Sequence, residues 1–331
     1  MTTQEATAET APPKGPGFAI RLESLIVLAV LGIGMSFLSP HFLQVSNLMN
    51  ILLATAVFGI LAFGATFVIA SGGIDLSLGS VLALSGVAGA LSMNALNLPW
   101  PIGIAICLLT GCLCGAVNGL LNTKGGIPAF IVTLGMLGVA RGLALTLTNG
   151  VPVYGLPDAV IFLGQGRLFK AEGFVGIPVP VVIFLIVAAL AHFTLSQTRF
   201  GKYALVIGDN EMAARAMGIR VERHRVKLYV LSGAMAGLAG LVFIARVNSG
   251  DPTAGLNYEL TAITAAILGG SNLFGGRASV AGTLIGALVM GVLQNGLNLL
   301  AVPSFYQQMA IGAVLVAAVW LDQMNRKRAA K

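Results

Sequence analysis

Residues 48–80 read LMNILLATAVFGILAFGATFVIASGGIDLSLGS, and this stretch decides the class of fold. The part from Leu48 to Ala70 carries no charged side chain. About 20 mostly apolar residues are enough for a helix to cross the hydrocarbon core of a bilayer. The glycine-rich sequence that follows, with Asp75 in it, marks the end of the apolar run. We therefore expect a membrane-spanning helix over this stretch.

The same apolar character extends over the whole chain of 331 residues. Hydrophobic residues make up 56% of it and charged residues only 9%, where a soluble domain has about 25% charged residues. The mean hydropathy is +0.91. A soluble fold could not bury this much apolar surface, and the 43 glycines suit close packing between membrane helices. The composition excludes a soluble domain.

Ten segments are predicted as membrane spans, although the eighth is too short to cross alone. They are Ser24–Ser39, Leu48–Ala70, Leu76–Leu96, Pro101–Leu121, Ile127–Leu147, Val179–Leu195, Val226–Ala245, Tyr258–Leu268, Val280–Leu300 and Gln307–Leu321. The predicted fold class is an all-α, polytopic membrane helix bundle of about ten transmembrane helices.

The basic residues predict the orientation. With ten spans, 15 of the 19 Lys and Arg residues fall on one side and three on the other, and Arg141 lies within a span. Cytoplasmic loops carry the excess of basic residues, so both termini are expected in the cytoplasm. The predicted organisation is a disordered cytoplasmic tail (1–21), a membrane domain (22–323) and a basic cytoplasmic tail (324–331). An inner loop covers 198–225 and an outer loop 149–178, where the outer loop is either a connector or a docking surface.

The inner loop contains a stretch with the signals of a short capped helix. Asp209 or Asn210 can cap its start, Glu211 suits the positive end of the helix dipole, and Gly218 suits the position just after its end. A well-capped helix is unusual in a simple connector. A second pattern, G-G-x-[DN]-L-x-x-G, occurs at 72–79 and again at 269–276, and internal duplication or chance could both produce it.

No residue pattern points to catalysis, a metal or nucleic acid. Cys107, Cys112 and Cys114 share one apolar run without the spacing of a zinc site, and the histidines are scattered. The formal charge of +7 is spread between and beyond apolar segments, so the basic loops of a membrane protein explain it better than a nucleic-acid surface. We predict no catalytic residues, no metal site and no nucleic-acid partner.

Polar side chains within spans are costly in lipid and tend to face the bundle interior. The candidates for a transport pathway are Asn118, Asn122, Thr133, Gln294, Asn295 and Asn298. For each of them, a hydrogen bond between helices is an alternative role. Gly111, Gly115 and Gly119 form a smooth helix stripe that favours close packing. Arg141 either snorkels to the headgroups or pairs with Glu259, which lies at a similar depth.

Four stretches resemble those of a known family. They are ASGGIDLSLGS (70–80), TLGM (133–136) with RGLA (141–144), GDNEMAAR (208–215) with Gly218, and AILGG (266–270) with FGG (274–276). From Leu48 to Leu321 the chain resembles a permease of the ribose, arabinose and xylose class of ABC importers, in the branched-chain amino acid and ribose permease superfamily. The third stretch resembles the E-A-A-x-x-x-G loop of importer permeases through Glu211, Ala213, Ala214 and Gly218, with Met212 inserted.

The resemblance implies a multi-pass subunit of the bacterial inner membrane that is not itself an enzyme. Two copies would form the pathway, a cytoplasmic ATP-binding subunit would hydrolyse ATP, and a periplasmic binding protein would deliver a monosaccharide. The helix with Asp209, Asn210, Glu211, Ala213, Ala214, Arg215 and Gly218 would sit in a groove on the ATPase. The chain has no G-x-x-x-x-G-K-[ST] loop, so ATP and magnesium are expected in the partner subunit.

Two alternatives stay open. The same machinery could carry a nucleoside, a signalling furanone or a branched-chain amino acid, because specificity would lie in the binding protein. A secondary transporter would instead need intramembrane acids for ion coupling. The sequence places Asp75 and Glu259 near the ends of spans, which disfavours it.

Overall fold

Helix α2 contains the apolar stretch from Leu48 to Ala70, and it runs through the centre of the molecule. The computed structural model describes residues 22–170 and 175–329. Its helices are α1 (Leu22–Leu38), α2 (Val45–Ala70), α3 (Leu78–Asn94), α4 (Trp100–Thr123), α5 (Ala129–Thr148), α6 (Asp158–Gln165), α7 (Val179–Gln197), α8 (Arg199–Asp209), α9 (Glu211–Ala216), α10 (Val221–Val247), α11 (Tyr258–Leu268), α12 (Val280–Leu299) and α13 (Ser304–Ala329).

Each of the ten predicted spans falls on a helix. Six of these, α2, α4, α5, α7, α10 and α12, are long and apolar enough to cross a membrane. Helices α1, α3, α11 and the part of α13 up to Trp320 are apolar but shorter. The prediction of a polytopic membrane helix bundle is confirmed. Helix α11, with 11 residues, is about 16 Å long, roughly half the thickness of the hydrocarbon core.

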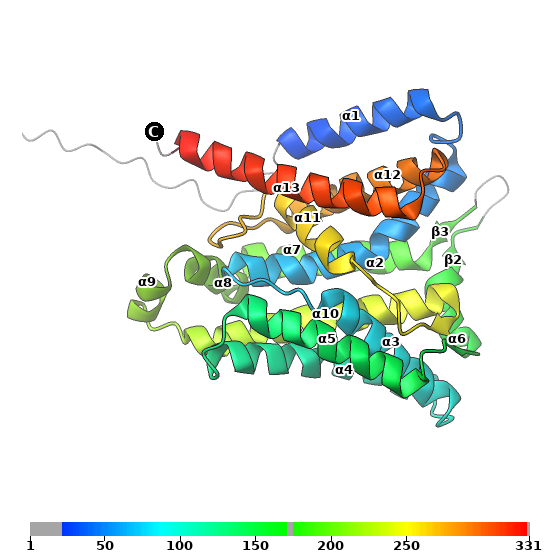
Figure 1. Ribbon diagram of the computed structural model, residues 1–331, viewed down its shortest axis with the longest axis horizontal. Coiled ribbons are helices and arrows are strands. Elements are labelled where there is room, and N and C mark those ends of the chain that lie inside the picture. The colour runs from blue at the N-terminus through cyan, green and yellow to red at the C-terminus, as the bar shows by residue number, and fades with distance from the viewer. Residues whose placement is uncertain (1–21, 171–174, 330–331) are drawn as a thin grey trace, which may run out of the picture.

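The helices run roughly along one direction, so the bundle has two ends (Figure 1). Helices α8 and α9 lie at one end, together with the C-terminal end of α13, and we call this the α9 end. Helix α6 lies at the opposite end with strands β2 (Arg167–Leu168) and β3 (Ile177–Pro178), and we call this the α6 end. Helices α4 and α5 form one edge of the bundle, and α1 and α13 form the other.

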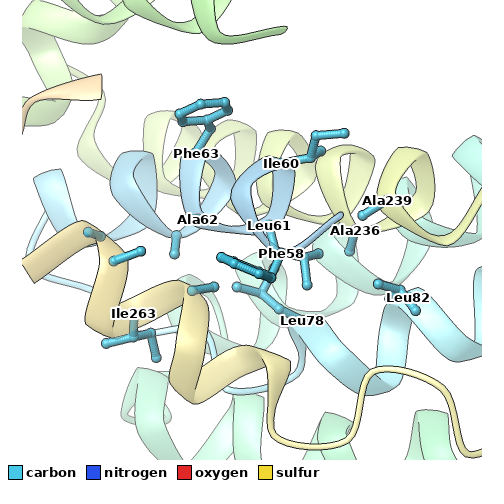
Figure 2. Close-up of a cluster of buried hydrophobic side chains, with 14 of the residues drawn as sticks. Phe58, Ile60, Leu61, Ala62, Phe63, Leu78, Leu82, Ala236, Ala239 and Ile263 are labelled. Carbon is cyan, nitrogen blue, oxygen red and sulfur yellow. The ribbon is translucent and has the colours of Figure 1, made fainter. Parts of the chain in front are cut away.

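The core forms around α2 because this helix is apolar on every side. From Thr55 to Ala70 every residue of α2 is buried. Phe63 stacks on Phe184 of α7 with ring centroids 5.4 Å apart, and Phe58 meets Tyr258 of α11 edge-on at 6.3 Å. Figure 2 shows Phe58 and Leu61 gathered with side chains of α3, α10 and α11. The other helices thus pack around α2 as a central element.

Helices α4 and α10 form the most extensive helix pair. A Cβ on Gly111 or Gly115 would overlap backbone atoms of Gly233 or Tyr229, and one on Gly119 would approach the Val226 Cα to 2.7 Å. Only glycine permits this approach of two backbones. The packing role predicted for the stripe at Gly111, Gly115 and Gly119 is confirmed.

Several elements differ from the prediction. The outer loop contains α6 and short strands, and β1 (Val153–Tyr154) pairs antiparallel with β4 (Ser249–Gly250). The fold is therefore not purely helical. The inner loop is itself mostly helical, because α8 fills 199–209 and α10 begins at Val221 instead of Val226. Helix α13 continues through most of the predicted basic tail. The predicted N-terminal tail, 1–21, lies outside the described residues.

Candidate functional site

The predicted capped helix exists as α9, at the α9 end. Asn210 rather than Asp209 is its N-cap, and its Oδ1 accepts a hydrogen bond from the Ala213 N–H at 3.0 Å. Glu211 lies in the first turn. Gly218 has φ +79°, and its N–H donates to the Arg215 carbonyl at 2.9 Å. Glycine is favoured here because side chains rarely adopt this backbone conformation.

Ion pairs fasten α9 to the start of α10. Arg215 contacts Glu211 at 2.7 Å and Glu222 at 2.5 Å, and Glu211 also contacts Arg225 at 2.6 Å. The hydrogen bond from Arg215 is the main cause of the lowered pKa of Glu211, with the charge of Arg225 adding to it. Each exposed pair contributes little alone. As a network, the three pairs hold α9 in one orientation.

A small apolar cluster lies beneath α9. Ala214 of α9 packs with Ile207 of α8 and Val221 of α10, and all three are buried. On the outside of α9, Met212 is 80% exposed and Met217 is 64% exposed. The helix therefore has one face that belongs to the fold and one apolar face without a partner in the described part of the chain.

The α8–α9 segment meets the membrane helices where backbones touch. A Cβ on Gly208 would overlap the Ala70 carbonyl and reach the Gly276 N–H, and one on Gly276 would lie 3.0 Å from the Asp209 Cα. The Gly276 N–H donates to the Ala70 carbonyl at 3.1 Å. We call this contact of Gly208, Ala70 and Gly276 the glycine junction. It joins the end of α8 directly to the end of α2 and to the loop after α11.

Both copies of the repeated G-G-x-[DN]-L pattern are breaks between helices. The first break, residues 71–77, separates α2 from α3, and the second, residues 269–279, separates α11 from α12. In the first, the Ser77 N–H donates to Asp75 Oδ1 at 3.0 Å, and in the second the Phe274 N–H donates to Asn272 Oδ1 at 3.1 Å. The same side-chain turn therefore forms twice. The breaks also touch each other, since a Cβ on Gly275 would lie 2.8 Å from the Gly72 nitrogen.

Asp75 lies between the end of α2 and the start of α3, as the sequence suggested, and it is also buried in the bundle. It is 2% exposed, and its carboxylate also accepts hydrogen bonds from the hydroxyls of Ser77 at 2.6 Å and Ser232 at 2.8 Å. Ser232 belongs to the middle of α10. The first break therefore re-enters the bundle, and Asp75 ties it to α10. In the sequence, the repeated G-G-x-[DN]-L pattern is the signal that could have pointed to this residue.

Two of the predicted pathway residues support the first break. Asn118 is 1% exposed and donates to the Ser77 hydroxyl at 3.0 Å. Thr133 is fully buried and donates to the Ala129 carbonyl at 2.9 Å, with the Ile74 carbonyl at 3.3 Å. Asn122, one turn beyond Asn118, donates to the Ile127 carbonyl at 3.0 Å in the turn after α4. The hydrogen bonds of these three residues join parts of the protein, namely the first break and the turn after α4, to the helices beside them.

The other three pathway residues, Gln294, Asn295 and Asn298, lie on α12 near its C-terminal end. Asn295 and Asn47 of α2 exchange amide hydrogen bonds of 2.9 and 3.0 Å. Asn298 accepts from Gln307 of α13 at 2.8 Å. The six candidates therefore form two separate groups, one at the first break and one at the other end of the bundle, and the structure does not bring them together.

Arg141 of α5 faces the protein interior and binds backbone carbonyls. Its Nη1 donates to the Pro252 carbonyl at 2.5 Å and to the Ala254 carbonyl at 2.8 Å. Glu259, at the start of α11, is 9% exposed and lies against Gly79 of α3. The ion pairs of the described residues do not include a direct contact between Arg141 and Glu259. Arg141 holds the loop that leads into α11, and its coupling to Glu259 stays a prediction.

An apolar groove opens beside the breaks. It encloses about 180 Å³, with Ile74 and Leu76 of the first break, Phe130 of α5, Ile263 of α11 and Leu315 of α13 among its lining residues. Helix α5 borders it and is the least buried of the six long spans. No atom of the described chain lies within 4 Å of a Cβ built on Gly135, Gly138 or Gly142 of α5.

Within the described residues, no group of His, Cys, Asp and Glu could hold a metal ion.

Comparison with known proteins assigns the family. The family model described as "Branched-chain amino acid transport system / permease component" matches residues 47–319. The chain is 42% identical to the ribose import permease protein of Escherichia coli strain K12, over 99% of this chain and 100% of that one. It is 42% identical to the ribose import permease protein of Bacillus subtilis strain 168, over 98% of this chain and 99% of that one.

More distant relatives extend the same pattern. The D-allose transport system permease protein of Escherichia coli strain K12 is 36% identical over 98% of this chain and 99% of its own length. No solved structure matches the chain significantly. These relatives are named as permeases and not as enzymes. The chain therefore belongs to the family of branched-chain amino acid transport system permease components, as a multi-pass protein of the bacterial inner membrane.

Proposed function

We propose that the chain is the membrane-spanning permease subunit of an ATP-driven importer and that it carries a monosaccharide, with ribose the first to test. The observation that carries the assignment is the similarity to ribose import permeases along nearly the full length of both chains. Allose and xylose permeases among the relatives support a sugar rather than a nucleoside, a furanone or an amino acid as cargo. The chain is a transport subunit, and ATP with magnesium is bound by a separate subunit.

The proposed topology has ten crossings with both termini in the cytoplasm. Six long apolar helices and four shorter ones support this number. The ten-span topology assigns 15 basic residues to one side of the membrane. Because cytoplasmic loops carry the excess of basic residues, this supports a cytoplasmic location of the α9 end. A cysteine introduced at Gln165 of α6 should react with an impermeant reagent in intact cells, whereas one at Arg223 should not. Labelling of Arg223→Cys in intact cells would contradict this orientation.

The proposed coupling element is the α8–α9 segment. The exposed face of α9, with Met212 and Met217, would sit in a groove on the ATPase, and Asp209, Asn210, Glu211, Ala213, Ala214, Arg215 and Gly218 would maintain its shape. Movement of α9 would reach the membrane helices through the glycine junction, because Gly208 and Asp209 touch Ala70 and Gly276 backbone to backbone. A contact without side chains leaves little to absorb the motion.

The proposed pathway lies between two copies of the chain. Helix α5 supports this, because Gly135, Gly138 and Gly142 lie on one face and no atom of the described chain lies within 4 Å of a Cβ built there. The glycines of α4 form the same kind of face, which α10 covers. Small residues on an open face allow a second membrane helix to approach closely. The groove between α5, α11 and α13 would then face the partner copy. A periplasmic binding protein would deliver the sugar at the α6 end.

One observation favours the secondary-transporter alternative. Asp75 and Glu259 are both buried among the helices, where ion-coupling acids are found. Reconstitution separates the two functions. The chain should be placed in liposomes with an ATPase subunit and a ribose-binding protein, and ribose uptake measured with ATP or with a proton gradient. We expect uptake that needs ATP and the binding protein. Uptake by the chain alone, driven by the proton gradient, would contradict the proposal.

A further inference from the structure

A basic pocket lies where α8, α9 and α10 meet, and the transport proposal uses only Met217 and Gly218 of its wall. The pocket encloses about 350 Å³. Arg220, Arg223, His224 and Lys227 line it together with Tyr203, and residues 217–219 complete its wall. Three of these side chains are basic ones of arginine and lysine, and none of the lining residues is an acid.

The acids of this region are engaged elsewhere. Glu211 and Glu222 form ion pairs with Arg215 and Arg225, neither of which lines the pocket. In the part of the chain that the structure describes, no ion pair includes Arg220, Arg223 or Lys227. All three side chains belong to exposed residues. The pocket therefore has a local excess of positive charge that the protein itself does not neutralise.

The helix geometry adds to this charge. Arg220 is the N-cap of α10 and makes no side-chain cap hydrogen bond. Arg223 and Lys227 follow at three and seven positions, which places all three cations on one face. The first turn of a helix leaves N–H groups without intrahelical partners and carries partial positive charge, and this combination binds phosphate. The pocket thus combines a helix start with three free cations.

The depth of the pocket matches that of lipid headgroups. Arg220 and Arg223 precede the apolar part of α10, which begins near Val226, and Lys227 lies in its first turn, so the cations stand at the edge of the hydrocarbon region. Tyr203 is 38% exposed, and tyrosine is enriched at this level of a membrane. Basic pockets between membrane helices on the cytoplasmic side bind phosphate headgroups. Arginine suits a phosphate because it can donate two parallel hydrogen bonds.

We propose that this pocket binds a phosphate-bearing anion, either the headgroup of an anionic phospholipid or a soluble phosphate compound. The ligand would bridge residues 217–219, which connect α9 to α10, with Arg223 and Lys227 on α10. Its presence would therefore add to the ion pairs that fix α9.

The test uses the full chain in nanodiscs of phosphatidylcholine, with or without phosphatidylglycerol. Binding is measured by native mass spectrometry and by the melting temperature. The pocket variant carries Arg220→Gln, Arg223→Gln and Lys227→Gln. The control variant carries Lys124→Gln, Arg199→Gln and Lys202→Gln, which removes three exposed cations of the same end outside the pocket. Each cation at a membrane surface contributes about fivefold to anion binding, so the pocket variant should bind phosphatidylglycerol about 100-fold more weakly.

The outcomes distinguish the two sources. Phosphatidylglycerol that raises the melting temperature of the wild type and the control variant, but not of the pocket variant, identifies a lipid site. The same pattern in neutral nanodiscs titrated with inorganic phosphate identifies a soluble ligand. If neither probe binds, or if the control variant loses as much binding as the pocket variant, the proposal is overturned. Lys227→Gln alone should lose about fivefold and Lys227→Arg almost nothing, which keeps the test valid if the triple variant is unstable.

Discussion

The first and second breaks share a sequence pattern and a local turn, yet their surroundings differ. In the first, Asp75 binds Ser232 of α10, and Asn118 of α4 supports Ser77 from the other side. In the second, the Asn272 side chain donates to the Gly275 carbonyl at 2.7 Å and accepts from the Phe274 N–H at 3.1 Å. The second break meets the α8–α9 segment through Gly276 and Asp209.

This difference assigns a separate mechanical role to each break. Helices α4 and α10 touch backbone to backbone and form the most extensive helix pair, so a loop tied to them is held by a large and closely packed contact. The second break follows α11, the shortest of the apolar helices, and its Gly276 touches Gly208 and Asp209 of the α8–α9 segment. We therefore expect the first break to be the fixed point and the second to follow α9.

The largest effect should come from filling the glycine junction. In Gly208→Val, the new side chain would overlap the Ala70 carbonyl and the Gly276 N–H. Overpacking of this kind costs about 1–3 kcal/mol of stability, and it should abolish ribose-stimulated ATP hydrolysis in the reconstituted importer. Gly32→Ala is the matched control, because a Cβ there meets no atom within 4 Å in the described chain. Normal uptake by Gly208→Val would show that the junction does not couple.

The next effect concerns the fixed point. Asp75→Ala should destabilise the chain, because it leaves the Ser77 N–H and the hydroxyls of Ser77 and Ser232 without their acceptor. Buried donors without partners cost about 1–3 kcal/mol each. Asp75→Asn keeps one oxygen acceptor and should be milder. Melting temperatures in detergent measure both variants. An Asp75→Ala chain as stable as the wild type would show that Asp75 does not fix the first break.

A third effect concerns the other end of α11. Arg141 holds the Pro252 and Ala254 carbonyls of the loop before α11, so that end should stay fixed while the second break moves. Hydrogen bonds from a charged group contribute about 1.5–3 kcal/mol, and Arg141→Ala should lose a comparable amount. The double variant Arg141→Ala, Glu259→Ala should lose less stability than the two single variants together, by a coupling energy of about 0.5 kcal/mol or more. An Arg141→Ala chain as stable as the wild type would leave snorkelling as the better account.

The smallest effect should come from the end of α9. Gly218 has φ +79° and no atom within 4 Å of a built Cβ in the described chain, so Gly218→Val meets backbone strain alone. The left-handed conformation costs a side chain about 1–2 kcal/mol. We expect a correctly inserted chain with impaired coupling of ATP hydrolysis to uptake. Gly218→Asn should retain more activity, because asparagine tolerates this conformation. Full activity of Gly218→Val would argue against a role in coupling.

Local signals in the sequence predicted local structure well. The apolar runs located ten apolar helices, six of them long enough to cross a membrane, because length and hydropathy alone decide whether a helix can cross a bilayer. The cap at Asn210 and the glycine at 218 predicted α9 because both act within one turn of helix. Helix α8 was missed because Gly201, Lys202 and Gly208 interrupt its apolar pattern.

Contacts between distant segments could not be predicted. Gly111 and Gly138 belong to equally smooth stripes, yet one is covered by α10 and the other is open, because the sequence of a helix does not name its neighbour. The burial of Asp75 could not be predicted, because nothing in residues 71–77 shows that its carboxylate accepts a hydrogen bond from Ser232, 157 residues later. The six polar candidates separated into two groups for the same reason.

Distances between spin labels show whether α9 and the second break move together against a fixed α4. Labels at Met212, Arg277 and Lys124 occupy exposed positions on α9, the second break and the end of α4. They should be measured in the reconstituted importer with and without ATP. We predict that the Met212–Arg277 distance stays constant while the Arg277–Lys124 distance changes. A changing Met212–Arg277 distance with a constant Arg277–Lys124 distance would contradict the account.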